Sequence, residues 1–75
     1  MKPNTKVGDK FRILGDGWWS CTTSLGSLRT VRTTDICVVT ETGDIHCHMD
    51  VFRAGENIGT VRVYWTFMKQ DFEKA

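Results

Sequence analysis

The sequence contains a single proline, Pro3, in 75 residues, and it has no apolar stretch long enough to cross a membrane. Its longest apolar run, 61–68, is interrupted by Arg62 and Thr66, whereas a membrane-spanning helix needs about 20 predominantly apolar residues. No apolar segment of the kind found in a secretory signal peptide follows the N-terminus. We therefore expect a chain that does not associate with membranes.

Cysteine is scarce, and its spacing shows no paired motif: the chain has three, Cys21, Cys37 and Cys47. An odd number without the paired spacing of a zinc ribbon favours reduced thiols in the cytoplasm over a disulfide framework or a metal site. His46 and His48 flank Cys47, but alternation along a strand sends them to the face opposite the thiol. We expect no metal and no other cofactor.

Catalytic groups in a usable arrangement are also missing. A nucleophile needs a base and an orienting group beside it, but Cys47 and the adjacent histidines point apart. Ser20, Ser24 and Ser27 belong to a polar loop, and the Gly-Asp-Gly at 15–17 lacks the third glycine and the helix of a phosphate-binding turn. A chain this short buries only about 60% of its unfolded surface, which leaves little room for a multi-part active site. We predict no catalytic residues and no enzymatic activity.

Apolar residues do not recur at helical spacing over the roughly 10 to 12 residues that a helix requires. They alternate with polar residues instead, which is typical of half-buried strands. The clearest alternation begins at Ile45, where Cys47, Met49 and Val51 share one face. The pattern predicts five strands, over residues 6–14, 28–33, 36–41, 45–52 and 60–68, with a polar loop over 18–27 that has room for an extended segment and one helical turn over 69–72.

Five short strands are too few for a two-sheet sandwich, but they can close into a small barrel, which leaves no exposed strand edge. We therefore predict an all-β fold in a single domain over residues 1–75, with 1–5 as a flexible tail. The predicted architecture is a five-stranded closed barrel.

Three segments carry a resemblance to a known fold: Lys6-Val7-Gly8-Asp9-Lys10-Phe11-Arg12-Ile13, the hairpin over 38–44, and the closing stretch over 64–73. With them the chain resembles the small SH3-like barrels. The resemblance implies a five-stranded SH3-like barrel in which a short 3₁₀ turn precedes the last extended residues. In its small size, its aromatic last strand and its Asp-Phe-Glu tail, the chain is also similar to accessory proteins of bacteriophages and prophages. That similarity implies a protein partner in the host cell and a location in the host cytoplasm.

The net charge of +1 conceals an uneven distribution along the chain. Residues 1–33 hold six basic and two acidic side chains, a net +4, whereas residues 34–75 hold four basic and seven acidic side chains, a net −3. A dedicated nucleic-acid-binding domain usually has a stronger basic excess. The overall charge therefore argues mildly against that role.

The most informative motif is Trp18-Trp19. Neighbouring residues on an extended segment face opposite ways, so only one tryptophan can readily enter a small core. Exposed tryptophan and arginine are the residue types that most often carry binding energy, although both indoles could instead close the ends of a barrel. Four basic side chains would gather near the loop if the strands over 6–14 and 28–33 pair, or they could form a solvated face. The predicted binding residues are Trp18, Trp19, Lys10, Arg12, Arg29 and Arg32.

Two functions fit these features. The first is a non-enzymatic protein-binding module, a phage-type protein that binds and inhibits a host protein such as RNA polymerase or a defence enzyme. The second is a small nucleic-acid-binding barrel that uses the tryptophans for base stacking and the basic side chains for phosphate contacts. We expect a monomer, or a weak dimer formed through a strand edge near 53–59.

Overall fold

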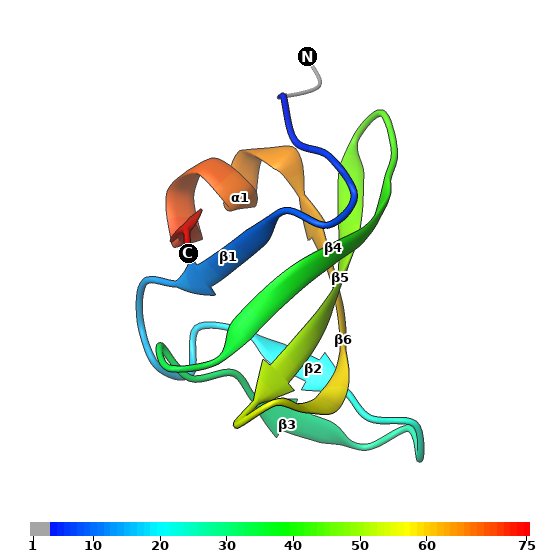
Figure 1. Ribbon diagram of the computed structural model, residues 1–75, viewed down its shortest axis with the longest axis vertical. Coiled ribbons are helices and arrows are strands. Elements are labelled where there is room, and N and C mark those ends of the chain that lie inside the picture. The colour runs from blue at the N-terminus through cyan, green and yellow to red at the C-terminus, as the bar shows by residue number, and fades with distance from the viewer. Residues whose placement is uncertain (1–3) are drawn as a thin grey trace.

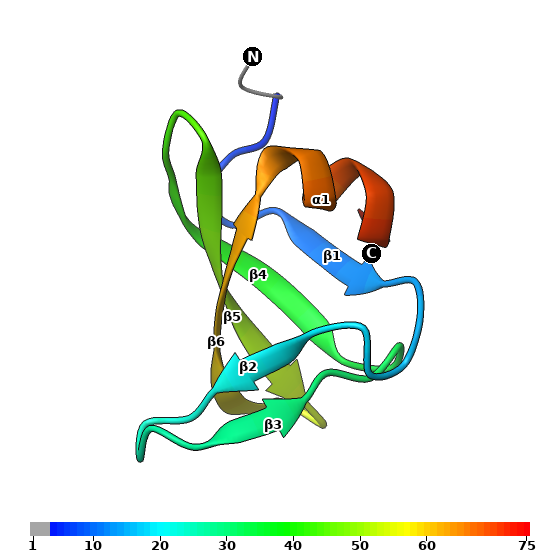
Figure 2. The ribbon, with the colours of Figure 1, turned by 180° about the vertical axis from the view of Figure 1, so that it is seen from behind.

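A computed structural model describes residues 4–75 of the chain, and the described part contains seven strands and one helix (Figures 1 and 2). Of the flexible tail predicted over 1–5, residues 1–3 lie outside the described part. The elements in chain order are β1 (Lys10–Ile13), β2 (Ser20–Thr22), β3 (Leu28–Thr30), β4 (Ile36–Thr42), β5 (His46–Arg53), β6 (Glu56–Tyr64), α1 (Trp65–Asp71) and β7 (Phe72–Lys74).

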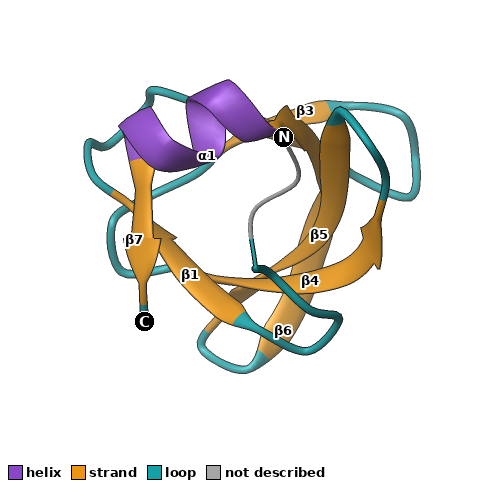
Figure 3. Ribbon diagram, turned by 90° about the horizontal axis from the view of Figure 1, so that it is seen from above, coloured by secondary structure: helices purple, strands orange, loops and turns teal. Residues whose placement is uncertain are grey.

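All seven strands belong to one antiparallel sheet with the order β3-β2-β6-β5-β4-β1-β7. The sheet curves around the core, and α1 connects β6 to β7 along one side (Figure 3). Within residues 4–75, β3 and β7 each pair on one side only, so the sheet is open. The prediction of an all-β fold is confirmed, whereas the five-stranded, closed, SH3-like barrel is wrong.

The central strands β4, β5 and β6 follow the predicted alternation most closely. On β5, Cys47, Met49 and Val51 are buried, while His46 and His48 are only partly covered on the opposite face. Cross-strand partners such as Val39↔Met49 and Met49↔Val61 keep the apolar side chains of the three strands on one face. These strands are long enough for the period of two to be read directly from the sequence.

The short strands at the sheet margins differ from the prediction. Strand β1 begins only at Lys10, because residues 6–9 form a turn in which the Asp9 N–H donates to Lys6 O at 3.0 Å and the Lys6 N–H donates to Asp9 Oδ2 at 2.9 Å. Strand β2 is the extended segment for which the predicted loop had room, and β7 supplies the last extended residues that the resemblance implies. Three residues are too few to show an alternation, so the formation of these strands depends on their pairing with neighbouring strands.

The predicted last strand over 60–68 is wrong beyond Tyr64, and the implied 3₁₀ turn is wrong too. The helical turn predicted over 69–72 is confirmed for 69–71, where it is the end of a longer helix. This helix is α1, at Trp65–Asp71. Within it the buried residues are Trp65 and Met68, a spacing of three that matches a helix, while Phe67 is exposed. One contact fixes the start of the helix: the Trp65 indole Nε1–H donates to Gly43 O, in the β4–β5 turn, at 2.9 Å.

The core lies between the concave face of the sheet and α1. Its members are apolar side chains from every strand but β3, from α1 and from the segment after β3: Phe11, Ile13, Cys21, Val31, Cys37, Val39, Cys47, Met49, Val51, Ile58, Val61, Val63, Trp65, Met68 and Phe72. Trp19 is half-buried and packs against this cluster. The core thus reaches the loop that precedes β2, which positions the Trp18-Trp19 motif.

Candidate functional site

Trp19 anchors the loop between β1 and β2 to the C-terminal part of the chain. Its indole Nε1–H donates to Asp71 Oδ2 at 2.8 Å, and its ring packs edge-on against Phe67 with centroids 5.7 Å apart. Phe72 lies on another side of the indole, with a centroid distance of 5.9 Å. Aromatic pairs at such distances add about 0.5 to 1.5 kcal/mol beyond the burial of their surface. Trp19 is therefore the tryptophan that joins the core.

Trp18 faces the opposite way, as the sequence predicts, and its side chain is 58% exposed. The indole lies over Gly15, where an added Cβ would overlap it, and the Trp18 N–H donates to Gly15 O at 3.4 Å. The absence of a side chain at Gly15 therefore makes room for the indole. The anchored neighbour Trp19 limits the freedom of the loop that presents Trp18.

Two further exposed apolar side chains come from the segments that contact this loop. Leu14 is 45% exposed, and its N–H donates to Asp71 O at 2.8 Å. Phe67 is 42% exposed and touches Trp19. We call Leu14, Trp18, Trp19 and Phe67 the tryptophan surface. The sequence pointed to the two tryptophans but not to Phe67, which the strand predicted over 60–68 placed on the same face as Val61 and Val63.

Carboxylates accompany the tryptophan surface. Asp71 accepts the Trp19 hydrogen bond, and Asp16 lies in the same loop. Asp16 Oδ1 accepts a hydrogen bond from the Thr33 N–H at 2.6 Å. This bond, assisted by the nearby positive charge of Arg32, lowers the pKa of Asp16 below its usual value. Both carboxyl groups therefore bring negative charge to the region.

Of the four predicted basic residues, Arg32 lies beside the tryptophan loop, because its neighbours Val31 and Thr33 donate their N–H groups to Trp19 O and Asp16 Oδ1. Lys10, Arg12 and Arg29 do not gather there. Strand β1 pairs with β4 and β7, whereas β3 pairs only with β2, so the strand pairing on which that prediction depended is wrong. Lys10 and Arg12 line a groove over β4 and β5 that also contains Phe52. Arg29 lines a separate groove along the β2–β3 hairpin, and Arg32 lies near Asp16.

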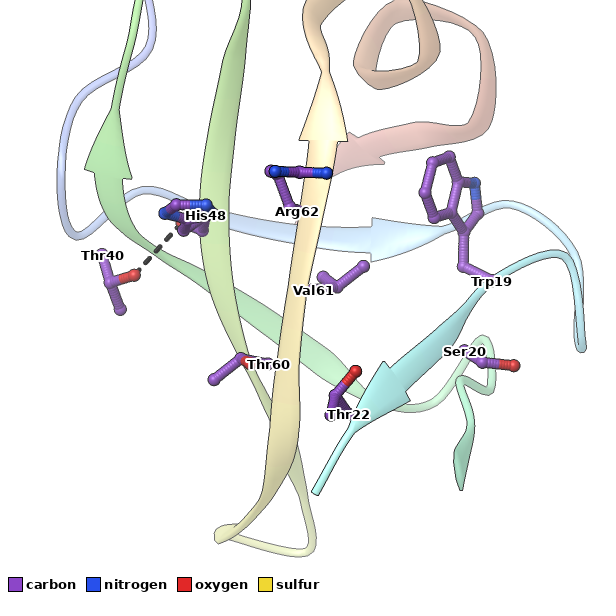
Figure 4. Close-up of a pocket in the computed structure, with 8 residues that line it drawn as sticks. All are labelled: Trp19, Ser20, Thr22, Thr40, His48, Thr60, Val61 and Arg62. Carbon is purple, nitrogen blue, oxygen red and sulfur yellow. Dashed lines mark hydrogen bonds between the residues drawn. The ribbon is translucent and has the colours of Figure 1, made fainter. Parts of the chain in front are cut away.

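A further groove, of about 530 Å³, lies where β2 and β6 diverge (Figure 4). The two strands meet at the pair Thr22↔Thr60, and from Thr22 back toward Ser20 strand β2 turns away from β6. Trp19 and Val61 lie along the opening, and Arg62 lies beside it on β6. The groove thus begins at the edge of the tryptophan surface. The sequence alone could not reveal it, because it depends on where two distant strands stop pairing.

The His-Cys-His motif divides between two faces, as predicted. The imidazoles of His46 and His48 lie on the outer face with ring centroids 5.1 Å apart, while Cys47 is fully buried. Glu41 Oε2 lies 3.4 Å from His48 Nδ1. Among residues 4–75, no group of three or more His, Cys, Asp or Glu side chains is arranged to hold a metal ion.

The three cysteines are buried free thiols. Burial raises the pKa of Cys37 to about 12 and that of Cys47 to about 11, and it also raises the pKa of Cys21. Because the thiolate is the nucleophilic form, these thiols are poorly reactive in the folded protein.

Comparisons of the chain with models of protein families, with curated proteins and with solved structures found no match. In the part of the chain that the structure describes, no helix combines the length and the apolar character needed to cross a bilayer.

Proposed function

We propose that this chain is a non-enzymatic protein-binding module that binds its partner through the tryptophan surface. The observation that carries the proposal is the exposed Trp18 indole, held over Gly15 in a loop that Trp19 ties to Asp71. Tryptophan is the residue type most enriched among the side chains that dominate binding energy at protein interfaces. A loop already held in place loses less conformational entropy on binding than a free one.

The charge near this surface favours a protein partner over a nucleic acid. Asp16 and Asp71 lie with the tryptophans, whereas Lys10 and Arg12 line a different groove. Phosphate groups approaching Trp18 would meet Asp16 and Asp71 with Arg32 as the cation beside Asp16, so the charge around the tryptophans gives little support to combined stacking and phosphate contacts. Phe67, in contact with Trp19, and Leu14, in the same loop as Trp18, add exposed apolar surface suited to a protein.

The resemblance to bacteriophage accessory proteins defines the partner class to test first, a host protein that this module would inhibit by covering part of its surface. A cytoplasmic location is part of the proposal, because three buried free thiols suit a reducing compartment. RNA polymerase and defence enzymes remain the candidate partners that the resemblance implies.

The decisive experiment is capture of partner proteins from host lysate with wild-type protein and with Trp18→Ala. We expect the variant to lose the captured partner, while its free energy of unfolding changes by less than about 0.5 kcal/mol because an exposed side chain is removed. Leu25→Ala is the matched control. Leu25 is 93% exposed in the loop between β2 and β3, which projects away from α1 (Figure 1), so this variant should capture as well as wild type.

The Trp19→Ala variant tests whether Trp19 anchors the β1–β2 loop, separately from the direct partner contact that we assign to Trp18. Removing this indole breaks the bond to Asp71 and the packing on Phe67 and Phe72, so we expect a loss of about 3 kcal/mol in urea unfolding. If Trp18→Ala captures the same partner as efficiently as wild type, the proposal is wrong.

A second candidate function rests on the groove that contains Lys10, Arg12 and Phe52. Two cations beside an aromatic ring suit a single-stranded nucleic acid, whose affinity would fall steeply as salt increases. Fluorescence anisotropy with labelled DNA and RNA oligonucleotides at about 50 mM salt tests this reading. Absence of binding, or binding that the double variant Lys10→Glu, Arg12→Glu leaves unchanged, would eliminate it.

A further inference from the structure

Strand β6 is longer than the strand that pairs with its second edge. On one side β6 pairs with β5 from Glu56 to Tyr64. On the other side β2 pairs with β6 at one position only, Thr22↔Thr60. Within residues 4–75, no strand therefore pairs with this second edge of β6 after Thr60.

The backbone directions along β6 show which groups this edge presents. The Trp65 N–H donates to Ile45 O at 3.1 Å, toward the β5 side. Because backbone groups alternate between the two edges of an antiparallel strand, Val61 and Val63 also direct their N–H and C=O groups toward β5. The N–H and C=O of Arg62 and the N–H of Tyr64 consequently point to the open edge, whereas the C=O of Tyr64, the N-cap of α1, accepts the first hydrogen bond of the helix. Such an edge is a template for pairing with another extended chain.

The open edge of β6 borders the groove between β2 and β6, and the side chains that line this groove suit a bound peptide (Figure 4). Trp19 and Val61 provide apolar surface along the opening. Arg62 is exposed, and its guanidinium forms no ion pair with any residue in the described range 4–75. The volume of about 530 Å³ lies within the range typical of ligand-binding sites, roughly 300 to 1,000 Å³.

We propose that the open edge of β6 binds an extended segment of a partner protein as an added strand, with an acidic side chain of that segment beside Arg62. The N–H and C=O of Arg62 and the N–H of Tyr64 would supply the hydrogen bonds, and the alternation of the added strand would turn the residues next to the acidic one toward Trp19 and Val61. The partner motif is thus an acidic residue between two apolar residues. This inference rests on the proposed protein-binding function and specifies how the partner is held.

A second copy of this chain is a poorer occupant of the same edge. Antiparallel pairing of two β6 strands around the short open stretch would bring the two Arg62 side chains close together. Like charges opposite each other destabilise a strand pair. An acidic segment of another protein meets the same guanidinium with opposite charge.

The test uses a displayed library of random decapeptides selected on the wild-type protein. We expect the selected peptides to share an acidic residue flanked by apolar or β-branched residues. Arg62→Glu should weaken binding of a selected peptide at least tenfold in a titration, whereas Arg29→Glu, on exposed strand β3, should leave the dissociation constant unchanged. If Arg62→Glu does not fold, Arg62→Gln provides the same comparison without charge reversal.

Amide hydrogen exchange detects directly whether a bound peptide pairs with β6 as an added strand. In the free protein, the amides of Arg62 and Tyr64 should exchange much faster than those of Val61 and Val63, and a bound peptide should slow the first pair at least tenfold. Slow exchange in the free protein, no peptide binding, or binding without protection of Arg62 and Tyr64 would overturn the inference. These outcomes differ from failure of the proposed function, in which Trp18→Ala captures a host partner as well as wild type.

Discussion

Asp35 is the one charged residue that is fully buried in the described part of the chain. Arg53 holds its carboxylate through two hydrogen bonds, from Nε to Oδ1 and from Nη2 to Oδ2, each 2.9 Å long. The Arg32 N–H adds a third at 2.8 Å, and Arg53 Nη2 also donates to Thr30 O at 2.9 Å. This cluster joins the turn before β4 to the end of β5 and to the end of β3.

The balance of effects on Asp35 determines how stability depends on pH. Burial by itself raises the pKa of the Asp35 carboxyl, but the hydrogen bonds from Arg53 and Arg32 and the positive charge of Arg53 outweigh it and lower the pKa. A lowered pKa in the folded state means that the ionised carboxylate stabilises the fold at pH values above the unfolded-state pKa of about 3.9. That stabilisation is lost as the pH falls through the lower folded-state pKa.

We predict that Asp35→Asn lowers the free energy of unfolding by about 2 kcal/mol near pH 7, because it leaves Arg53 without its anionic partner. Urea unfolding should show the difference from wild type shrinking as the pH falls from about 4, where Asp35 of the unfolded wild-type chain becomes protonated, toward the lower pKa of the folded state. Asp44→Asn is the control, since Asp44 is exposed in the turn between β4 and β5. A constant difference between Asp35→Asn and wild type across this pH range would contradict the assignment.

At the level of secondary-structure elements, Gly59 determines how closely β2 approaches β6. Its φ is +153°, and a Cβ at this position would lie 2.7 Å from Thr22 O and 2.9 Å from Cys21 Sγ. Backbone atoms cannot give way as a flexible side chain can. A side chain at position 59 would therefore push β2 away from β6 at the pair that begins the groove.

We predict that Gly59→Ala lowers the free energy of unfolding by about 2 to 3 kcal/mol, from overlap with the β2 backbone together with the strained φ. Chemical denaturation with circular dichroism measures the loss. Gly15→Ala is the informative comparison, because the atoms nearest to its Cβ would all belong to the exposed Trp18 indole, which can rotate away. Equal destabilisation by Gly59→Ala and Gly15→Ala would argue against close packing of β2 on β6 at Gly59.

The elements that the sequence predicted well are those with enough residues to show a period. Strands β4 and β5 extend over seven and eight residues, and their burial alternates as expected. Helix α1 has only seven residues, and its chain continues directly from β6, so Trp65 and Phe67 fit a strand pattern by coincidence. Its helical state depends on packing of Trp65 and Met68 against the rest of the core.

At the level of the whole molecule, the three thiols come from three different strands of one core. Cys21 lies on β2, Cys37 on β4 and Cys47 on β5, and each is fully buried. Exposing all three requires separation of strands across the sheet. Their reactivity therefore reports on the cooperative unfolding of the molecule.

We predict that a thiol-reactive chromogenic disulfide reagent labels none of the three cysteines of the native protein near pH 8 and labels all three in denaturant. Burial raises the pKa of Cys37 to about 12 and that of Cys47 to about 11, so almost no thiolate exists at that pH in the folded state. The labelling rate at intermediate urea concentrations should follow the rate or population of global unfolding. Rapid labelling of one thiol in native buffer would show that its strand opens separately.

The global topology and the candidate site were only partly predictable for the same physical reason. Alternation tells which face of a strand is buried, and it placed Cys47 inside and Trp18 and Trp19 on opposite sides. It does not tell which strands pair, so both barrel closure and the gathering of Arg29 and Arg32 with Lys10 were wrong. Contacts such as Trp19 with Asp71, 52 residues apart, leave no local trace in the sequence.

The three tryptophans occupy three depths of the molecule, which gives the protein a built-in optical reporter. Trp65 is 6% exposed with its indole N–H bonded to Gly43 O, Trp19 is half-buried, and Trp18 is in contact with water. Emission from the buried indole lies at shorter wavelengths than emission from the solvated one. A partner that covers the loop would shift and shield the emission of Trp18 and Trp19 but leave that of Trp65 unchanged, so binding and unfolding can be followed separately in one unlabelled sample.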